Sequence, residues 1–361
     1  MLWRRKRVAS RWPRRARCRR SKACPRCARA ADDGRAPVVE QVCDDPAIYR
    51  IRLPFANLGA GEANCHVLHD DGQWLIVDAG AAGLGNARRL QTALRDLSVD
   101  FSACQVLLTH GHFDHAGVLS SILPASVPLC LSRVAVVARE PARLGHIQGE
   151  FRREMRALGA SFEDACTYGA CNAETVAFPL GRFSYRFVAE GDEVSVGRCR
   201  FRVLETPGHT PDHLCWYEPD RGILFAGDHV LPAATPAVDA HPDGVDGFGL
   251  YLRHLRRVRD LPVRLGLFGH GDPERDGAAL ARRVDTLIAR KQSRAKAVRA
   301  FLCDRRGASG EEVARCALAG LSEASWYATR PMARYYFMLE ALVVLRHLRV
   351  TGKIEHCAAP H

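Results

Sequence analysis

The chain has 361 residues, 47% of them hydrophobic, which is enough for one large or two ordinary domains with a substantial core. Its net charge of +12 comes from residues 1–36, which hold 14 Lys and Arg against two acids, whereas the remainder has 38 basic and 38 acidic residues. The balanced remainder argues against a protein that binds polyanions over its whole surface. No apolar run approaches the ~18 residues of a membrane-spanning helix, so we expect no contact with a membrane.

The basic segment 1–36 is expected to be a disordered extension, because it shows neither helical nor strand periodicity. It also lacks the apolar centre of a secretory signal. Three interpretations stay open: an arm that binds nucleic acid, an organelle address, or codons read from a misplaced start. The 14 cysteines are scattered, which favours reduced thiols in a cytoplasmic compartment over a disulfide framework.

The hydrophobic pattern predicts an α/β protein. In chain order, strands are expected at 48–54, 64–70 and 74–80, a helix at about 84–96, and strands at 105–110 and 128–133. An amphipathic helix is expected within 134–180, more strands within 183–209, a hairpin at 213–228, a helix at 248–261 and a strand at 264–271. Two β-rich stretches, each followed by helices, indicate two packed sheets covered by helices.

The tail of the chain has a different pattern. Helices are expected at 280–302, 310–319 and 331–348, followed by a short strand in RVTGKIEH (349–356). This order predicts a small winged-helix-like domain over 280–356. Its first helix is rich in basic residues, which are Arg282, Arg283, Arg290, Lys291, Arg294, Lys296 and Arg299.

The segment QVLLTHGHFDHAG (105–117) places metal-binding side chains directly after an apolar run. Residues i and i+2 of an extended segment point to the same side, so His110 and His112 can hold one ion. A tight turn then brings Asp114 and His115 towards a second ion. Further candidates follow three later strands: His209 in TPGHTPDH, Asp228 in FAGD and His270 in FGHG.

This set of side chains predicts a site for two divalent ions. Imidazole and carboxylate groups without thiolates suit Zn²⁺, and also Fe or Mn. Seven ligands are too many for one tetrahedral ion, and a carboxylate such as Asp228 can bridge two. The remaining histidines are expected to be ordinary polar residues, namely His66, His69, His146 and His241. His213 is either a packing residue or a partner that orients a ligand.

These motifs resemble the metallo-β-lactamase fold superfamily. HGHFDH matches the family motif His-x-His-x-Asp-His, and the later ligands follow in the family's order. The resemblance implies an αββα sandwich catalytic domain over 45–278. It implies a first ion held by His110, His112 and His209, a second held by Asp114, His115 and His270, and Asp228 between them. Asp78, at the end of IVDAG (76–80), would orient the loop and a ligand.

The tail looks like the winged-helix domain of the β-lactamase-like protein 2 branch of this superfamily. Activities around that branch include cleavage of single-stranded RNA and hydrolysis of thioesters or lactones. The preferred hypothesis is a hydrolase in which a hydroxide between two metal ions, oriented by Asp114 as the catalytic residue, attacks a small thioester, lactone or related ester. By fold analogy alone, Asn57, Asn64 and Tyr251 are candidate substrate contacts.

Other functions stay open at this point. The alternative is a metal-dependent endoribonuclease acting on single-stranded RNA, supported by the basic tail helix and residues 1–36. Nucleic acid as a partner is therefore kept but not favoured. A non-catalytic DNA-binding regulator is disfavoured, because segment 331–350 is apolar on most sides. Dimerisation through this last helix is a further hypothesis.

Overall fold

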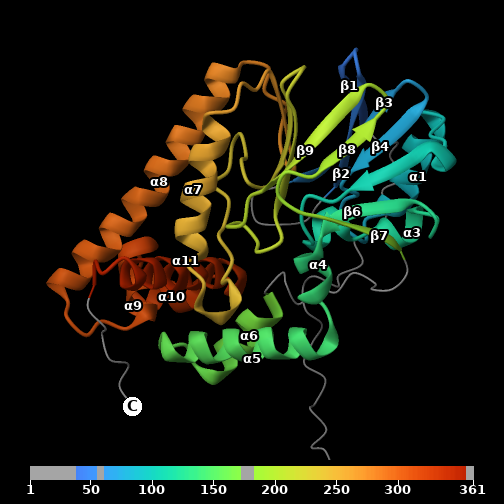
Figure 1. The fold of residues 1–361 in the computed structure, drawn as a ribbon. Helices are drawn as coiled ribbons and strands as arrows, with labels where there is room; N and C mark the ends of the chain where they lie inside the picture. The colour runs from blue at the N-terminus through green and yellow to red at the C-terminus, as the bar shows by residue number, and fades with distance from the viewer. Residues whose placement is uncertain (1–37, 55–60, 172–182, 355–361) are drawn as a thin grey trace, which may run out of the picture.

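The computed structural model describes residues 38–54, 61–171 and 183–354 of the chain (Figure 1). The expectation for segment 1–36 and the candidate contact Asn57 lie outside these ranges. Within them, the chain forms two β-sheets, with helices over both outer faces. No helix of the described ranges is long and apolar enough to cross a membrane.

The first sheet has seven strands in sequence order, β1-β2-β3-β4-β5-β6-β7. Its strands are β1 (Val38–Cys43), β2 (Ala47–Pro54), β3 (Glu62–Asp70), β4 (Gln73–Val77), β5 (Cys104–Leu107), β6 (Pro128–Ser132) and β7 (Ser184–Val188). Strands β1 to β4 pair antiparallel, and β4 to β7 pair parallel. The parallel half therefore brings the carboxyl ends of its strands to one edge.

The second sheet has five strands in the order β12-β11-β10-β9-β8. Its strands are β8 (Glu193–Val196), β9 (Cys199–Glu205), β10 (Leu214–Glu218), β11 (Ile223–Gly227) and β12 (Leu265–Phe268). Only β11 and β12 pair parallel, and their carboxyl ends also meet at one edge. All five residues of β10 are buried, because both faces of this sheet are covered.

The helices complete the layers. They are α1 (Asn86–Asp96), α2 (Phe113–Ala116), α3 (Leu119–Ile122), α4 (Arg133–Val137), α5 (Pro141–Ala157), α6 (Phe162–Cys171), α7 (Gly247–Arg259), α8 (Gly277–Asp304), α9 (Gly310–Glu312), α10 (Glu323–Ala328) and α11 (Pro331–Val350). Short 3-10 segments occur at η2 (Phe101–Ala103) and η4 (Pro242–Gly244), and a π-helical segment at η5 (Val313–Leu318).

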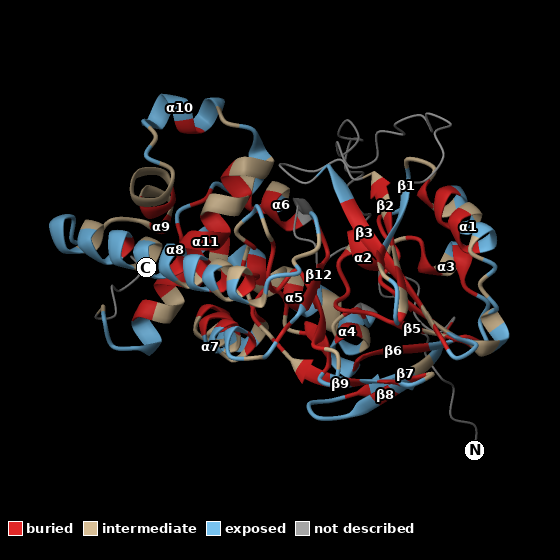
Figure 2. Ribbon diagram, turned by 90° about the horizontal axis from the view of Figure 1, so that it is seen from above, coloured by how far each residue is buried: buried red, intermediate tan, exposed pale blue. Residues whose placement is uncertain are grey.

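The buried apolar residues fall into three main clusters, one for each interface between layers. One cluster lies between the two sheets and includes Leu68, Trp216 and Phe225. A second lies between the first sheet and the helices α1 and α3. The third joins the second sheet to α5, α6, α7, α8 and α11, so the C-terminal helices share its core (Figure 2). The order of layers is helix, sheet, sheet, helix, which confirms the expected αββα sandwich with added C-terminal helices.

The C-terminal segment differs from its expectation in one place. Three helices were expected there, and all three positions are helical. The first is occupied by α8, the second by α9 together with η5, and the third by α11, while α10 was not expected. The strand expected at 349–356 is wrong for its described part, because Arg349 and Val350 continue α11 and residues 351–354 form a turn. Gly352 has a φ of 66°, which ends the helix. A winged-helix topology for this segment stays a prediction.

The other expected strands were confirmed at their positions in the sequence, although several begin or end at different residues. Strand β1 was not expected from the sequence, although it pairs with β2. The strands expected to reach Gly80 and His110 end earlier, at Val77 and Leu107. Asp78 has a φ of 57°, so the chain leaves the sheet there. The residues that follow these two strands lie at the candidate metal centre.

Candidate metal centre

The seven candidate ligands lie together at one edge of the two sheets, and all are buried or nearly so. They follow the carboxyl ends of the strands β5, β9, β11 and β12. Three groups of ligand atoms are close enough to hold an ion. The groups are His110, His112 and His209; Asp114, His115 and His270; and His110, His115 and Asp228, with the atoms of each group within 4.8 Å of one another.

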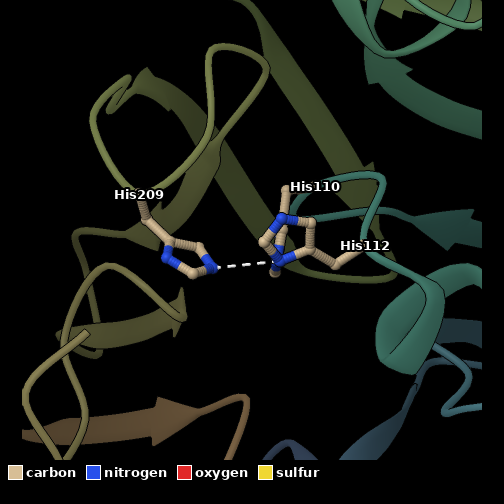
Figure 3. A group of neighbouring side chains, drawn as sticks. All are labelled: His110, His112 and His209. Atoms are coloured by element: carbon tan, nitrogen blue, oxygen red, sulfur yellow. Dashed lines mark hydrogen bonds between the residues drawn. The ribbon is translucent and has the colours of Figure 1, made fainter. Parts of the chain in front are cut away.

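The first triad is formed by His110, His112 and His209, whose rings lie edge to face with their centroids 4.5–4.9 Å apart (Figure 3). The Nε2 atom of His209 lies 3.2 Å from the Nδ1 atom of His112. The opposite ring nitrogens of these two residues donate to the protein, to the carbonyl of Ala237 at 2.8 Å and to the Oδ2 atom of Asp239 at 3.1 Å respectively. These partners fix the tautomers, so that the inner nitrogens of both rings face the site.

The second triad is formed by Asp114, His115 and His270. Asp114 and His115 lie in the short helix α2, and the Nε2 atom of His270 lies 3.3 Å from the Oδ2 atom of Asp114. The Nδ1 atom of His270 donates to the carbonyl of Glu62 at 2.6 Å. The Nε2 atom of His115 lies 3.9 Å from the same Asp114 oxygen. Both imidazoles again direct one nitrogen inward and anchor the other.

Asp228 lies between the two triads. Its Oδ2 atom is 3.7 Å from the Nε2 atom of His209 and 3.4 Å from that of His270, and its Oδ1 atom is 3.5 Å from that of His115. The backbone N–H of Asp228 donates to the Nε2 atom of His213 at 3.2 Å. His213 therefore holds the backbone that carries this carboxylate, which agrees with the positioning role rather than the packing role left open for it.

Asp78 holds the end of β5 and one ligand. Its carboxylate accepts hydrogen bonds from the backbone N–H and the hydroxyl of Thr109, both at 2.8 Å, and from the Nδ1 atom of His115 at 2.7 Å. The Thr109 hydroxyl also accepts from the Nδ1 atom of His110 at 3.0 Å. One carboxylate thus orients a ligand of each triad, directly in one case and through Thr109 in the other.

Several residues that position the site were missed by the sequence interpretation. Asp239, which orients His112, lies 127 residues away from it in the chain. Gly111, between the first two ligands, donates its N–H to Asp212 at 2.8 Å, and its carbonyl accepts from the guanidinium of Arg139 at 2.6 Å. Arg139 is buried, and a side chain at Gly111 would overlap it. Of these residues, Gly111 and Asp212 had a sequence signal, because they lie within the HGHFDH and TPGHTPDH motifs.

The charges of the site differ between its two halves. Burial, and then the neighbouring imidazoles, lower the pKa of His110 and His209, so these residues prefer the neutral form that binds metal. Burial opposes protonation of His270, but Asp228 and Asp114 outweigh it and raise its pKa to about 10. The same balance raises the pKa of His115, with Asp228 as its strongest charged neighbour. The second half thus carries the surplus negative charge that a cation site requires.

The residues present fit a divalent metal ion. Within the described ranges, the buried atoms that make no hydrogen bond include the Nε2 atoms of His110 and His115 and the Oδ1 atom of Asp228. Buried polar atoms normally have a partner, so three unpaired atoms facing one site indicate a ligand. Imidazole nitrogen and carboxylate oxygen are donors for Zn²⁺, Fe and Mn.

Two candidate substrate contacts are corrected by the structure. Asn64 is buried, and its amide donates to the carbonyls of Phe268 and Gly271, so it holds the loop that carries His270. Tyr251 is fully buried, and its hydroxyl donates to the carbonyl of His229 at 2.9 Å. Both polar groups are used inside the protein, where a buried group left without a partner would be costly.

The histidines expected to be ordinary polar residues lie outside the two triads. His66 is buried in β3 with its pKa lowered to about 3 by burial, and His69 stacks on Trp74 at 4.1 Å. His241 donates to the carbonyl of Gly208 at 3.2 Å. His146 lies on α5 near Glu150 and Asp243, in an exposed group with metal-ligand spacing.

Comparison with known proteins agrees with this geometry. The sequence profile of the metallo-beta-lactamase superfamily matches residues 58–270. The chain is 27% identical to the probable metallo-hydrolase YqjP of Bacillus subtilis over 72% of this chain and 81% of that protein. It is also 27% identical to the atrochrysone carboxyl ACP thioesterase of Aspergillus fumigatus, over 65% of this chain and 58% of that protein. These matches and the clustered ligands indicate a metallo-hydrolase.

A solved structure extends the similarity to the C-terminal helices. A beta-lactamase domain protein from Burkholderia ambifaria superposes with a TM-score of 0.71 at 22% identity, over 88% of this chain and 90% of that one. An alignment that covers this much of the chain must include residues beyond 270, where the profile match ends. The fold with its added helices is therefore shared with that protein.

Proposed function

The chain belongs to the metallo-beta-lactamase superfamily, and from that premise we propose that it holds two divalent metal ions and hydrolyses a small thioester, lactone or related ester. Zn²⁺ is the favoured metal, with Fe or Mn as alternatives. The observation that supports two ions is the position of Asp228, whose oxygens lie 3.4–3.7 Å from imidazole nitrogens of both triads. A carboxylate between two sets of ligands is the arrangement that a two-metal site needs.

The residues of the chain have separate roles in this proposal. His110, His112 and His209 would hold one ion, and Asp114, His115 and His270 the other, with Asp228 between them. Bound divalent ions would supply positive charge that polarises a carbonyl and lowers the pKa of a water molecule. Asp114 is buried, and burial opposes the lowering of its pKa by His115 and His270, yet the pKa stays below its ordinary value. Its carboxylate can therefore accept a hydrogen bond from the attacking water and orient it.

The proposed substrate class is supported by similarity and by charge. The similarity to a protein named as an ACP thioesterase favours a thioester or a related acyl compound. The chain beyond residue 36 carries equal numbers of basic and acidic residues, which does not favour a polyanion. A small molecule is therefore the proposed partner, and we propose that the protein acts in the cytoplasm without contacting a membrane.

The basic residues of α8 give less support to the ribonuclease alternative than the sequence suggested. Lys291 is buried and pairs with Glu340 at 3.0 Å. Arg283 donates to the carbonyl of Leu231 at 2.7 Å, and Arg290 donates to the hydroxyl of Thr235 at 3.3 Å. These side chains bind other parts of the same chain, so they contribute less to a surface for RNA. A homodimer through the C-terminal helices stays a prediction.

The proposal is tested by metal analysis and by turnover of two substrate panels. Purified protein would be loaded with Zn²⁺, Fe²⁺ or Mn²⁺, its bound metal measured, and each form assayed with acyl thioesters and lactones and with labelled single-stranded RNA. Asp114→Asn should reduce turnover of the preferred substrate by a factor of about 100 or more, because oriented catalytic groups contribute at least that much. The control is Asp220→Asn in the exposed turn after β10, which should leave turnover unchanged.

Each outcome decides between the alternatives. Turnover of thioesters or lactones that is lost in Asp114→Asn, with RNA left intact, supports the proposal. Cleavage of RNA alone, sensitive to the same substitution, would replace it with the ribonuclease. Saturation at a single ion per chain would contradict the two-metal assignment.

A further inference from the structure

The segment 237–246, which follows β11 and precedes α7, contacts the first triad directly. The carbonyl of Ala237 accepts the hydrogen bond from the Nδ1 atom of His209 at 2.8 Å. The Oδ2 atom of Asp239 accepts from the Nε2 atom of His112 at 3.1 Å. The orientation of both imidazoles therefore depends on where this segment lies.

The backbone of the same segment is tied to the loop that carries His209. The N–H of Asp239 donates to the carbonyl of His209 at 3.0 Å, and the Nε2 atom of His241 donates to the carbonyl of Gly208 at 3.2 Å. Residues 237–241 belong to no strand or helix. Because no sheet ladder or helix holds them in place, their position must come from other contacts.

Arg346 of α11 supplies the contacts on the far side of the segment. One nitrogen of its guanidinium donates to the carbonyls of His241 at 2.6 Å and Val245 at 3.1 Å. The other terminal nitrogen donates to the carboxylate of Glu154 in α5. The Arg346 side chain is only 10% exposed. The planar fork of arginine presents two separate nitrogens to these acceptors in a fixed geometry, whereas the ammonium of lysine is a single point of contact.

We propose that Arg346 is a positioning residue of the metal centre, which holds segment 237–246 so that Ala237 and Asp239 orient His209 and His112. Arg346 does not touch the triad and acts only through this segment. This inference rests on the proposed function in one respect, which is that the first triad holds an ion. It assigns α11 a role in positioning the metal centre.

A second contact from the same helix supports the proposal. The Nδ1 atom of His347 lies 2.9 Å from the Oδ2 atom of Asp246, and the other oxygen of Asp246 caps α7 by accepting from the N–H of Gly249 at 2.9 Å. Neighbouring residues of α11 thus bind both ends of the stretch 241–246. The helix itself is fixed, because its apolar residues are buried in the core that it shares with the second sheet.

The test compares Arg346→Met with Arg349→Met, which changes an exposed arginine on the same helix. The first measurement is hydrogen–deuterium exchange of segment 237–246 in full-length protein. The second is titration with Co²⁺ alone against a competing chelator, followed by the visible absorption of the bound ion. In Arg346→Met we expect faster exchange in 237–246. We also expect the affinity for one of the two Co²⁺ ions to fall about 10-fold, which is the lower end of the range found when residues that orient metal ligands are replaced. The affinity for the other ion should change by less than about threefold, and Arg349→Met should match the unaltered protein.

Two results would overturn the proposal. Unchanged exchange and unchanged Co²⁺ affinities in Arg346→Met would show that the segment is held without the arginine. Equal weakening of both ions, with faster exchange throughout the C-terminal helices, would show a general structural role. If Arg346→Met does not fold, Asp239→Asn tests the other end of the same connection and should weaken one ion selectively; a symmetric loss there also overturns the proposal.

The proposed function and this inference can fail separately. Exchange of segment 237–246 is measured without substrate, and Co²⁺ affinity without turnover. A protein that binds two ions but hydrolyses no ester would leave the inference standing. A protein that binds no ion would remove both the proposed function and the role of Arg346 in a metal centre, whereas unchanged exchange and unchanged Co²⁺ affinities in Arg346→Met would remove the inference alone.

Discussion

Replacing Gly269 with alanine should damage the metal centre without straining the backbone. Gly269 precedes His270, and its φ lies outside the left-handed region, so alanine can adopt its conformation. However, a Cβ atom there would lie 2.1 Å from the Oδ1 atom of Asp228 and 2.5 Å from the Cε1 atom of His115. The methyl group would therefore occupy the space next to the carboxylate that joins the two triads.

The size of the effect follows from how firmly these groups are held. Carbon and oxygen atoms in contact are separated by more than 3 Å, so Asp228 or the β12 loop must move by about 1 Å. The N–H of Gly269 donates to the carbonyl of Gly227 at 2.8 Å, which ties the two loops together. A displacement of this size lowers activity about 100-fold, whereas overpacking costs only about 1–3 kcal/mol of stability.

The assay for Gly269→Ala is kcat/KM on the preferred substrate, together with bound metal per chain and the midpoint of urea unfolding. We expect kcat/KM to fall by about two orders of magnitude while the protein remains folded. Gly145→Ala is the matched control, because no atom lies within 4 Å of a Cβ placed on this exposed position of α5. Full metal content with kcat/KM within a factor of about two of the unaltered protein would refute the reasoning, since a displacement of the ligands must lower activity.

Two further substitutions test other parts of the structure. Asp78→Asn should weaken metal binding about 10–100-fold in a chelator competition, because the amide cannot accept from both Thr109 donors and from His115 as the carboxylate does. Glu340→Gln should lower the free energy of unfolding in urea by about 3–5 kcal/mol, because it leaves Lys291, whose side chain is 1% exposed, without its charged partner.

Each of these substitutions has its own comparison. Asp71→Asn changes an exposed aspartate in the β3–β4 turn and should leave metal affinity unchanged. If Asp78→Asn matched it, the carboxylate would not be needed to orient the ligands. Replacing both Glu340 and Lys291 with methionine should cost much less than Glu340→Gln alone, because no charge is left buried. An equal loss in the two variants would mean that packing, not charge, explains the effect.

The ligands at the strand ends could be predicted from the sequence, because a buried strand and the polar residues that follow it are neighbours in the chain. A run such as Val106–Leu108 predicts a buried strand, and polar ligands directly after it must lie at the edge of a sheet. The same logic placed Asp78, Asp228 and His270 correctly at strand ends. The alternation of strands and helices likewise predicted the layered fold.

The exposed or buried state of long polar side chains could not be predicted in this way. The sequence indicated that Lys291 and Arg283 belong to a basic helix surface. In the structure, Lys291 is buried in an ion pair and Arg283 donates to the carbonyl of Leu231. Helical periodicity shows which residues share a face, but not which segment of the chain covers that face. The strand expected at 349–356 is wrong in its described part for the related reason that α11 continues two residues beyond the helix expected at 331–348.

The sequence alone determined the layered α/β class, the order of the ligand motifs and the chemistry of their donor atoms, because each of these depends on residues close together in the chain. Only the tertiary structure decided which distant groups orient the ligands. Asp239 reaches His112 across 127 positions, and Arg346 binds the carbonyl of His241 across 105. Hydrogen bonds over such separations depend on how the packed layers meet, which no local pattern of residues contains.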